Sequence, residues 1–426
     1  MILTKEEQEI YNGKQGEVMA KIMKTLVLYG DLYGAKKLVP INHNGHLVTS
    51  MGIGLMKPVF RTMDEIINAG IVSKWKFTAD PRPIDYKNVK CSLIDKLIFS
   101  KIMYSQQKRY EKQLLKVGLI NKDAFSCVCY SPQMGNVPNY GDVLSWAESS
   151  AVVYANSVLG ARCNRNSGMI DLFGCIIGKV PEFGLLLEEN RKADWFIEIK
   201  TNKLPEAQIL GSVIGLKVQD QVPYIKGLDK FLGNELNNDV KAYLKDMGAA
   251  CASNGAVGLF HIENLTPEVK GAKNPSHYIK PNAQTFVITE KELEETYNNY
   301  PVVWKDINAK PSLCFIGCPH LTLEQLNKWT ENITTALKEN NRKKLCLRTI
   351  LTTSPAVLKE FKQTENYAKL IATGAKLTSI CPLMYTNNPL AGKKPIITCS
   401  NKLRTYSTAR YKKDAEIINI ITGKEK

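Results

Sequence analysis

Short apolar runs alternate with helix-like segments in the second half of the chain. Runs at 195–199, 256–262, 313–316, 345–351 and 377–380 have the pattern of buried strands. Helical patterns lie between them, and Thr322 with Gln325 forms a capping box that opens a helix to about residue 338. Alternation of this kind predicts an α/β fold with parallel sheets flanked by helices.

The first 125 residues have a mainly helical pattern. A helix is predicted over 6–28, behind a capping box formed by Thr4 and Glu7. A glycine-rich stretch at 44–54 interrupts the pattern. It lacks the spacing of a phosphate-binding fingerprint, so we expect a structural loop there.

A second segment, 142–162, is rich in Ser and Ala and is predicted to form one continuous helix. Ser145, Ser149 and Asn156 would then share one helical face, which we expect to be buried. Buried polar groups need partners. Close packing of helices through small residues explains the Ser and Ala, but it does not explain Glu148 or Asn156.

Length and composition indicate a multidomain globular protein. A chain of 426 residues exceeds the size at which a single core stops growing. Lys, Asn, Pro and Glu dominate 270–300, where a boundary is plausible. We therefore expect a mainly helical N-terminal region (1–125), a central α/β domain with the Ser/Asn-rich helix (126–290) and a C-terminal α/β domain (291–426).

Composition also limits where the protein works. No run of 18 apolar residues is present, which predicts no membrane span. Acidic residues occupy the start, where a signal peptide needs an apolar run. Eleven cysteines without such a signal favour a reducing, cytoplasmic setting with free thiols, most of them buried packing residues.

The net charge of +16 raises the alternative of a nucleic-acid or anion-binding protein. The basic residues are scattered, however, and no stripe of basic and aromatic residues stands out. We favour a solvated Lys surface, and therefore no nucleic-acid partner. An anionic substrate or an acidic partner subunit would suit the charge as well.

Three cysteines in turn-like contexts carry the clearest chemical signal. Cys129, Cys318 and Cys381 each precede or adjoin a segment built from Pro, Gly and Asn. Cys318-Pro319 and Cys381-Pro382 each follow a predicted strand, and ligands of open α/β sheets bind beyond the carboxyl ends of strands. An iron–sulfur cluster that is held by three thiolates, rather than by four, would keep one iron open to substrate.

Other interpretations of these cysteines stay open on motif grounds. A zinc site normally shows paired C-x2-C elements, and only Cys127-Val128-Cys129 comes near. Two buried strand-end cysteines with a packing role are as plausible as a shared cluster.

Several longer motifs strongly resemble the catalytic large subunit of the aconitase X family. The resemblance covers nearly the whole chain. It rests on stretches within 130–165, 248–268, 317–321 and 398–410, including Gly135-Asn136, 146–150, 155–162 and Gly317-Cys318-Pro319-His320.

The resemblance implies an aconitase-like multidomain fold and a dehydratase with an iron–sulfur cluster held by Cys129, Cys318 and Cys381. Family members dehydrate cis-3-hydroxy-L-proline or mevalonate 5-phosphate. A small swivelling domain, fused or separate, completes their active site and supplies a serine thought to be the base. This chain is too short to include that domain, so a separate acidic or neutral small subunit is implied.

Site roles follow from the resemblance and from side-chain chemistry. Glu148, Ser149 and Ser150 would orient substrate or relay a proton, and His320 would hydrogen-bond a cluster sulfur or the leaving group. Arg162 and Arg165 would pair with carboxylate or phosphate, because a guanidinium fork matches those groups. The remaining expected substrate-binding residues are Gly135, Asn136, Asn156, Ser157, Ser400, Asn401, Lys402 and Arg404.

Each of these assignments has a structural alternative. Lys402 and Arg404 also fit an exposed basic turn, and a lone His such as His320 is more often structural. The chain departs from its relatives at Cys127, an additional thiol, and at Cys163 and Asn166 near the expected pocket. A non-catalytic scaffold subunit that keeps the fold but lacks the chemistry is the third possible function.

Overall fold

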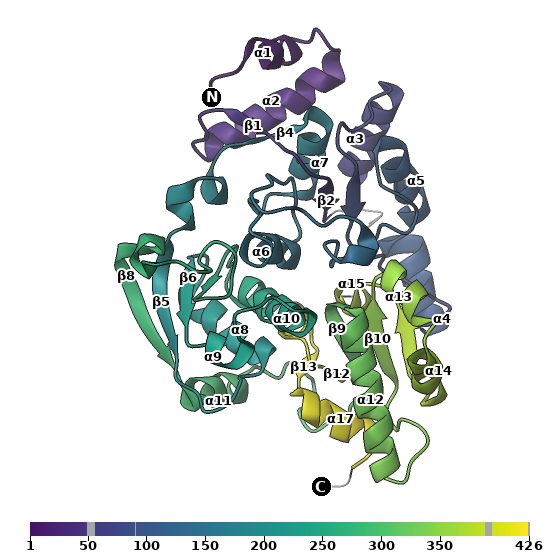
Figure 1. Cartoon of the computed structure of the whole chain (residues 1–426). Helices are drawn as coiled ribbons and strands as arrows, with labels where there is room; N and C mark the ends of the chain where they lie inside the picture. The colour runs from purple at the N-terminus through teal and green to yellow at the C-terminus, as the bar shows by residue number, and fades with distance from the viewer. Residues whose placement is uncertain (49–55, 90, 388–393, 425–426) are drawn as a thin grey trace.

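The computed structural model describes residues 1–48, 56–89, 91–387 and 394–424. The predicted α/β fold is confirmed: two sheets, of four and five strands, are parallel throughout and are flanked by helices. Figure 1 shows three parts arranged around a centre that contains α6, α10 and α15. The loop expected at 44–54 is wrong in its described part, because Gly45–Leu47 forms strand β2, and residues 49–54 lie outside the described residues.

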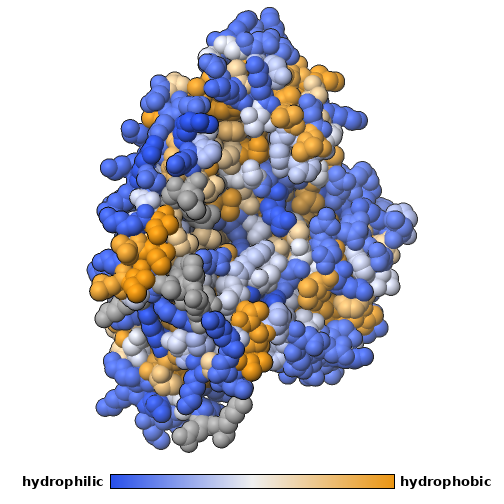
Figure 2. All heavy atoms as spheres, turned by 180° about the vertical axis from the view of Figure 1, so that it is seen from behind, coloured by the Kyte–Doolittle hydropathy of each residue, from blue (hydrophilic) through white to orange (hydrophobic). Residues whose placement is uncertain are grey.

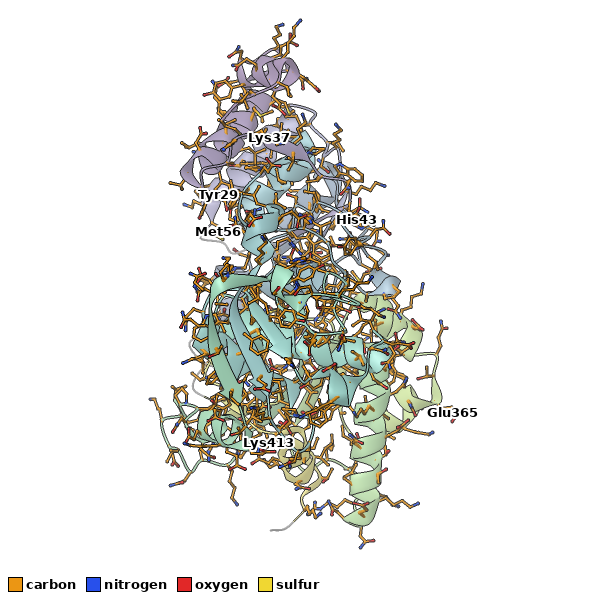
Figure 3. The ribbon with its side chains drawn as sticks, turned by 60° about the vertical axis from the view of Figure 1, so that its left-hand side comes forward. Tyr29, Lys37, His43, Met56, Glu365 and Lys413 are labelled. Atoms are coloured by element: carbon orange, nitrogen blue, oxygen red, sulfur yellow. The ribbon has the colours of Figure 1, made fainter. Side chains whose placement is uncertain are left out.

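The N-terminal part, residues 1–191, is mainly helical, and most of it stands above the other two parts in Figure 1, while α4 lies beside α13 and α14. Figure 3 labels Tyr29, Lys37 and His43 within it. Its two small sheets pair β1 with β4 and β2 with β3. Its main elements are α1 (Lys5–Tyr11), α2 (Glu17–Leu32), β1 (Leu38–Pro40), β2 (Gly45–Leu47), α3 (Lys57–Asn68), β3 (Phe77–Ala79), α4 (Leu93–Leu97), the π-helix η1 (Ile98–Met103), α5 (Gln107–Val117), the 3-10 helix η2 (Pro132–Met134), α6 (Ser149–Ser157), α7 (Gly168–Ile177) and β4 (Lys179–Pro181).

The central part, residues 193–298, contains the four-stranded sheet in the order β7-β6-β5-β8. Alternate residues of β5 are buried, and α8 and α10 supply much of the adjoining core. Its main elements are β5 (Ala193–Ile199), α8 (Ala207–Val218), β6 (Pro223–Lys226), α9 (Asp229–Leu232), α10 (Asn238–Asn254), β7 (His261–Ile262), β8 (Ile279–Ile288) and α11 (Glu290–Asn298).

The C-terminal part, residues 311–422, contains the five-stranded sheet in the order β11-β10-β9-β12-β13. Every residue of the central strand β9 is buried. Its elements are β9 (Leu313–Leu321), α12 (Leu323–Glu339), β10 (Thr349–Thr353), α13 (Pro355–Phe361), α14 (Glu365–Ala372), β11 (Lys376–Thr378), α15 (Pro382–Thr386), β12 (Ile396–Thr398), α16 (Asn401–Tyr406), β13 (Arg410–Tyr411) and α17 (Asp414–Thr422). The domain divisions expected after residues 125 and 290 stay predictions.

Two predicted helices are wrong in extent. The 6–28 helix is two helices, α1 and α2, because Gly13 and Gly16 take positive φ angles of 91° and 93° between them. The 142–162 helix shrinks to α6, because the chain before it is extended and pairs with other segments. Val143 bridges Arg162, and Trp146 bridges His46. Long-range pairing there overrides local helix propensity.

Strand ends also differ from the sequence prediction. The 256–262 run is a strand only at His261–Ile262, and β10 begins at Thr349 rather than at residue 345. Cys318 lies inside β9 rather than beyond it. Regular pairing of β9 covers its first residues, up to Ile316, and the register then shifts before Leu321, so Cys318 occupies the irregular stretch.

The face shown in Figure 2 is predominantly polar, with an apolar patch over α4 and η1. Leu93, Ile94 and Leu97 of α4 are among the exposed large apolar residues. On its inner side the same segment packs Phe99 and Tyr104 against the C-terminal part. No helix among the described residues is long and apolar enough to cross a membrane.

Candidate active site

A cavity of about 370 Å³ lies where the three parts of the chain meet. The N-terminal part contributes Glu148 at the start of α6, the central part contributes the end of α10, and the C-terminal part contributes β9, α15 and α16. Seven residues proposed from the sequence line it: Glu148, Ser149, Arg165, Cys318, His320, Cys381 and Lys402. The fold therefore gathers polar groups separated by more than two hundred residues into one cavity.

Three thiols line this cavity, those of Cys127, Cys318 and Cys381. Cys129 is fully buried in the adjoining core and does not line it. Cys127 lies at a bend of the chain and Cys129 at the turn that follows. Among the described residues, no three His, Cys, Asp or Glu side chains gather as ligands of a single metal ion would.

His320 ties the three thiol-bearing segments together. Its Nε2–H donates to the Ile380 carbonyl at 3.1 Å, beside Cys381, and its Nδ1 accepts from the Ser126 hydroxyl at 3.1 Å, beside Cys127. Its backbone N–H points at the Cys127 Sγ at 3.4 Å. Burial lowers the pKa of His320 to about 4, so the ring is neutral at pH 7. Both ring nitrogens are engaged, which makes His320 a positioning residue in this arrangement.

Burial controls the ionisation of the thiols. It raises the pKa of Cys318, raises that of Cys127 well above its ordinary value and raises that of Cys381 to about 12. The Lys402 ammonium opposes this effect at all three thiols. A thiol must lose its proton to bind a metal, so metal binding here would release protons and Lys402 would favour it.

Glu148 and Lys402 form a buried ion pair on the cavity wall. Glu148 caps α6: its Oε2 accepts from the Ala151 N–H at 2.7 Å and from the Ser150 hydroxyl at 2.6 Å. Burial alone would raise the pKa of Glu148, but the Lys402 charge and these hydrogen bonds outweigh it and lower the pKa. The Lys402 ammonium also lies 3.4 Å from the Ser149 Oγ, so Glu148 is ionised and Lys402 is charged.

Among the described residues, Arg165 is the other cation that lines this cavity, and its side chain is exposed. Lys402 and Arg165 therefore differ in their surroundings. The Lys402 ammonium is buried and paired with Glu148, whereas the Arg165 guanidinium is exposed to solvent. A small anion entering the cavity can therefore pair with Arg165 without displacing an internal carboxylate.

The far end of α6 holds expected substrate-binding residues that do not line the cavity. Asn156 donates to the carbonyls of Cys163 and Gly258 at 2.8 and 2.9 Å and accepts from the Cys163 N–H and from Arg191. The Ser157 hydroxyl accepts from the Phe260 N–H at 2.9 Å. Arg162 pairs with the exposed Glu188. These groups connect α6 to the neighbouring loops.

Other predicted residues also face structural partners. Asn401 bonds Gln208 of α8 through its backbone and side chain, at 2.9 and 2.6 Å. Arg404 lies 4.2 Å over the Tyr300 ring. The Ser400 hydroxyl donates to the Cys318 carbonyl, which holds that cysteine segment against α16.

Gly135 ends the short helix η2 with a φ of 67°. Asn136 is fully buried and bonds Gly45 and Thr78. Two of the three departures from the family pattern, Cys163 and Asn166, are likewise absent from the cavity lining among the described residues, whereas the third, Cys127, lines it. The predicted roles of all these residues stay predictions.

Sequence reasoning missed Asp80, which lines the cavity as Cys127 does. Its neighbour His46 is fully buried, with Nε2 3.3 Å from the Asp80 Oδ1. The two residues are 34 positions apart, without a metal-ligand spacing, so no local signal marks them. Pairing of β2 with β3 brings them together.

Comparison with known proteins identifies the family. Three family models match consecutive regions: the aconitase X first domain over residues 1–189, the second domain over 193–298 and the third domain over 311–421. The crystal structure of Thermococcus kodakaraensis aconitase X in its holo-form superposes with a TM-score of 0.80 at 26% identity, covering 99% of this chain and 100% of that one.

The relatives with named activities fall into two groups. The phosphomevalonate dehydratase large subunit of Methanocaldococcus jannaschii is 32% identical, with 78% of both chains covered. The corresponding subunit of Thermococcus kodakarensis is 31% identical, with 78% of this chain and 77% of the relative covered. The cis-3-hydroxy-L-proline dehydratase of Pseudomonas aeruginosa is 27% identical, with 67% of this chain but 47% of the relative covered.

Fold, family models and relatives define one class of protein. The chain belongs to the aconitase X family. It is a dehydratase, a hydro-lyase of the aconitase X type. The resemblance expected from the sequence motifs is confirmed, and the enzyme interpretation is preferred over the scaffold and the nucleic-acid binder.

Proposed function

We propose that this chain is the large subunit of an iron–sulfur-dependent dehydratase that removes water from mevalonate 5-phosphate. Coverage of the relatives supports this choice. The large subunits of phosphomevalonate dehydratase match over about four fifths of their own length, whereas the hydroxyproline dehydratase of Pseudomonas aeruginosa is a longer protein matched over less than half. The relatives' name, large subunit, supports a separate small subunit as the partner of this chain.

The single observation that carries the proposal is the cavity where thiols, cations and a carboxylate meet. Phosphomevalonate is anionic at both ends, and an exposed Arg165 offers a guanidinium fork for one of them. The +16 charge favours capture of such an anion from solution. cis-3-Hydroxy-L-proline, a smaller substrate with one carboxylate, is the second candidate because relatives of that name also match.

The donor set at the cavity fits an iron–sulfur cluster. Three thiols line the same cavity, and cysteine thiolates are the usual ligands of iron–sulfur clusters. We assign the ligands as Cys127, Cys318 and Cys381, with Cys129 as the alternative first ligand. When bound, the cluster would supply a Lewis-acidic iron for the leaving hydroxyl.

The protein's own residues would do the remaining work. Lys402, held by Glu148, would orient one carboxylate oxygen of the substrate, and Ser149 would donate a hydrogen bond beside it. His320 would hold the segments that carry Cys127 and Cys381 in fixed positions relative to each other through its two ring hydrogen bonds. The proton next to the carboxylate would be removed by a base from the small subunit, the role that the family resemblance gives to a serine.

The test is anaerobic production of the chain alone and together with a small subunit, followed by iron and sulfide determination and assays of water loss. Mevalonate 5-phosphate and the cis and trans isomers of 3-hydroxy-L-proline are compared. Cys318→Ser should remove iron and activity together. Water loss only from cis-3-hydroxy-L-proline would transfer the proposal to that substrate, and full iron content without activity on either would refute both.

The first ligand is settled by a matched pair of variants. If Cys127 is the ligand, Cys127→Ser loses iron while Cys129→Ser keeps it. The opposite result would assign Cys129, as the sequence motif predicts.

A further inference from the structure

Arg82 follows the cavity wall and holds the chain at Cys381. The residue before it, Pro81, lines the cavity, whereas Arg82 is not among the described residues that do so. The Arg82 backbone forms a parallel bridge with Ile380, and its carbonyl accepts from the Cys381 N–H at 2.8 Å. The backbone of Arg82 therefore fixes the segment that carries one of the assigned thiol ligands.

The Arg82 side chain reaches a second thiol-bearing segment. Its guanidinium lies 4.2 Å from the centre of the Phe125 ring, two positions before Cys127, and its Nη2–H donates to the Lys122 carbonyl at 2.6 Å. A cation over an aromatic face and a charge-assisted hydrogen bond both favour this placement. One residue thus contacts the chain near Cys127 through its side chain and the chain at Cys381 through its backbone.

Glu111 on α5 fixes the direction of the Arg82 guanidinium. The Arg82 Nε–H and Nη2–H donate to the two Glu111 carboxylate oxygens, each at 3.1 Å. Two parallel contacts hold a planar guanidinium in one orientation, which a single contact to an ammonium does not. The Glu111 carboxylate also accepts from the Gln107 amide of the same helix at 2.9 Å. The Arg82 and Glu111 side chains are 30% and 23% exposed, so solvent screens their attraction and the pair contributes mainly geometry.

His320 makes a separate link between the same two segments. Its ring bonds the Ser126 hydroxyl and the Ile380 carbonyl at the cavity wall. Arg82 makes its link at a different place, where it lines a groove of about 380 Å³ that His320 does not line. A single link would let the two segments pivot about it, whereas two links at different places fix their relative orientation.

We propose that Arg82 is a positioning residue that holds the Cys127 and Cys381 thiols at the separation that the iron–sulfur cluster requires. This rests on the proposed function, because the two thiols are taken as cluster ligands. Without its guanidinium, Arg82 would keep its backbone contacts with Cys381 but would lose those with Phe125 and α5. The two ligand segments would then no longer be held as one unit, and the cluster would be bound less tightly.

The key variant is Arg82→Met, which keeps an apolar stem and removes the guanidinium. Contacts behind metal ligands contribute about 10–100-fold to metal affinity. After anaerobic loading, Arg82→Met should therefore release iron to a ferrous chelator about 10–100-fold faster than the wild type. The urea midpoint of the cluster-free variant should stay close to the wild-type value, because the ion pair is partly exposed. A residue that contributed only to stability would give the opposite pattern.

The matched control is Arg109→Met. Arg109 lies on the same helix as Glu111, pairs with Asp64 and lies 5.7 Å from the centre of the Phe60 ring. Both of these partners belong to α3 rather than to a thiol-bearing segment, so this control should release iron at the wild-type rate. Arg82→Lys should fall between the wild type and Arg82→Met, because an ammonium keeps the charge but lacks the planar fork.

Glu111→Gln tests whether the orientation of the guanidinium matters. It keeps one oxygen acceptor, so it should speed iron release less than Arg82→Met does. In the Arg82→Met background it should have no further effect, because the two side chains act as one unit. A full additional effect in that background would overturn the proposal, since Glu111 would then act without Arg82.

A second readout needs neither cluster nor activity. In the cluster-free protein, iodoacetamide alkylation of each thiol is followed by mass spectrometry, with the exposed Cys346 as the internal reference. Arg82→Met should raise the alkylation rates of Cys127 and Cys381 relative to Cys346, and Arg109→Met should not.

The proposal is overturned if Arg82→Met releases iron at the wild-type rate, if Arg109→Met releases it equally fast, or if the alkylation rates are unchanged. A wild type that binds no cluster, or that binds one and dehydrates neither candidate substrate, would fault the proposed function. The alkylation rates would still show whether Arg82 holds the two thiol-bearing segments.

Discussion

The two ends of helix α6 use similar polar residues for opposite purposes. At its start, Glu148, Ser149 and Ser150 surround the Lys402 ammonium beside a cavity. At its end, Asn156 and Ser157 are just as buried, but they bond backbone groups and Arg191. The difference is what lies opposite: open volume at one end and saturated backbone at the other. Burial of a polar residue therefore does not by itself indicate a role in chemistry.

The largest expected effect is at the start of α6. Lys402→Met leaves Glu148 as an uncompensated buried charge, so the free energy of unfolding should fall by about 3–5 kcal/mol, and activity should be lost. Urea unfolding and steady-state assays measure the two effects. The double variant Glu148→Gln with Lys402→Met should regain part of the stability but none of the activity. A single variant as stable as the wild type would mean that the pair is not buried as described.

The corresponding change at the end of α6 should separate stability from substrate binding. Asn156→Ala leaves two carbonyls and the Cys163 N–H without their partner, which should cost about 1–3 kcal/mol of unfolding free energy. Because Asn156 does not line the cavity, the KM of the folded variant should stay at the wild-type value. A raised KM with unchanged stability would mean that Asn156 contacts the substrate, so that both ends of α6 would belong to the active site.

The same buried network should respond to pH. His261 donates to the Arg191 carbonyl at 2.8 Å, and burial lowers its pKa below the ordinary value of about 6.5. As the pH falls below that value, the unfolded chain binds a proton that the folded chain does not, so stability is lost on acidification. Urea midpoints between about pH 5 and 8 should fall towards the acid side, and less steeply for His261→Gln than for the wild type. Equal slopes would contradict a neutral buried His261.

The smallest effect is expected at Arg162, which follows the end of α6. Its ion-pair partner Glu188 is 73% exposed, so solvent screens the pair. Arg162→Met should therefore change the free energy of unfolding by only about 0–1 kcal/mol, with activity retained. If activity on the phosphorylated substrate fell sharply while activity on hydroxyproline was retained, Arg162 would be a phosphate contact after all. Thermal unfolding and paired substrate assays distinguish the cases.

The sequence located most elements and several cavity residues. The capping boxes at Thr4 and Thr322 are present as predicted, as are the strand at 195–199 and the parallel sheets. Family motifs singled out Glu148, Cys318, Cys381 and Lys402, which do line one cavity. These signals are local: a cap, a buried strand or a motif is encoded within a few neighbouring residues.

Tertiary structure alone decided the rest, because it depends on what packs against each segment. Pairing of Val143 with Arg162 and of Trp146 with His46 turned a helical pattern into extended chain. In the folded chain Cys127 lines the cavity and Cys129 lies in the core, a choice that two cysteines two positions apart do not encode. Asp80 and His46 carry no mutual signal in the sequence, and only the pairing of β2 with β3 brings them into contact.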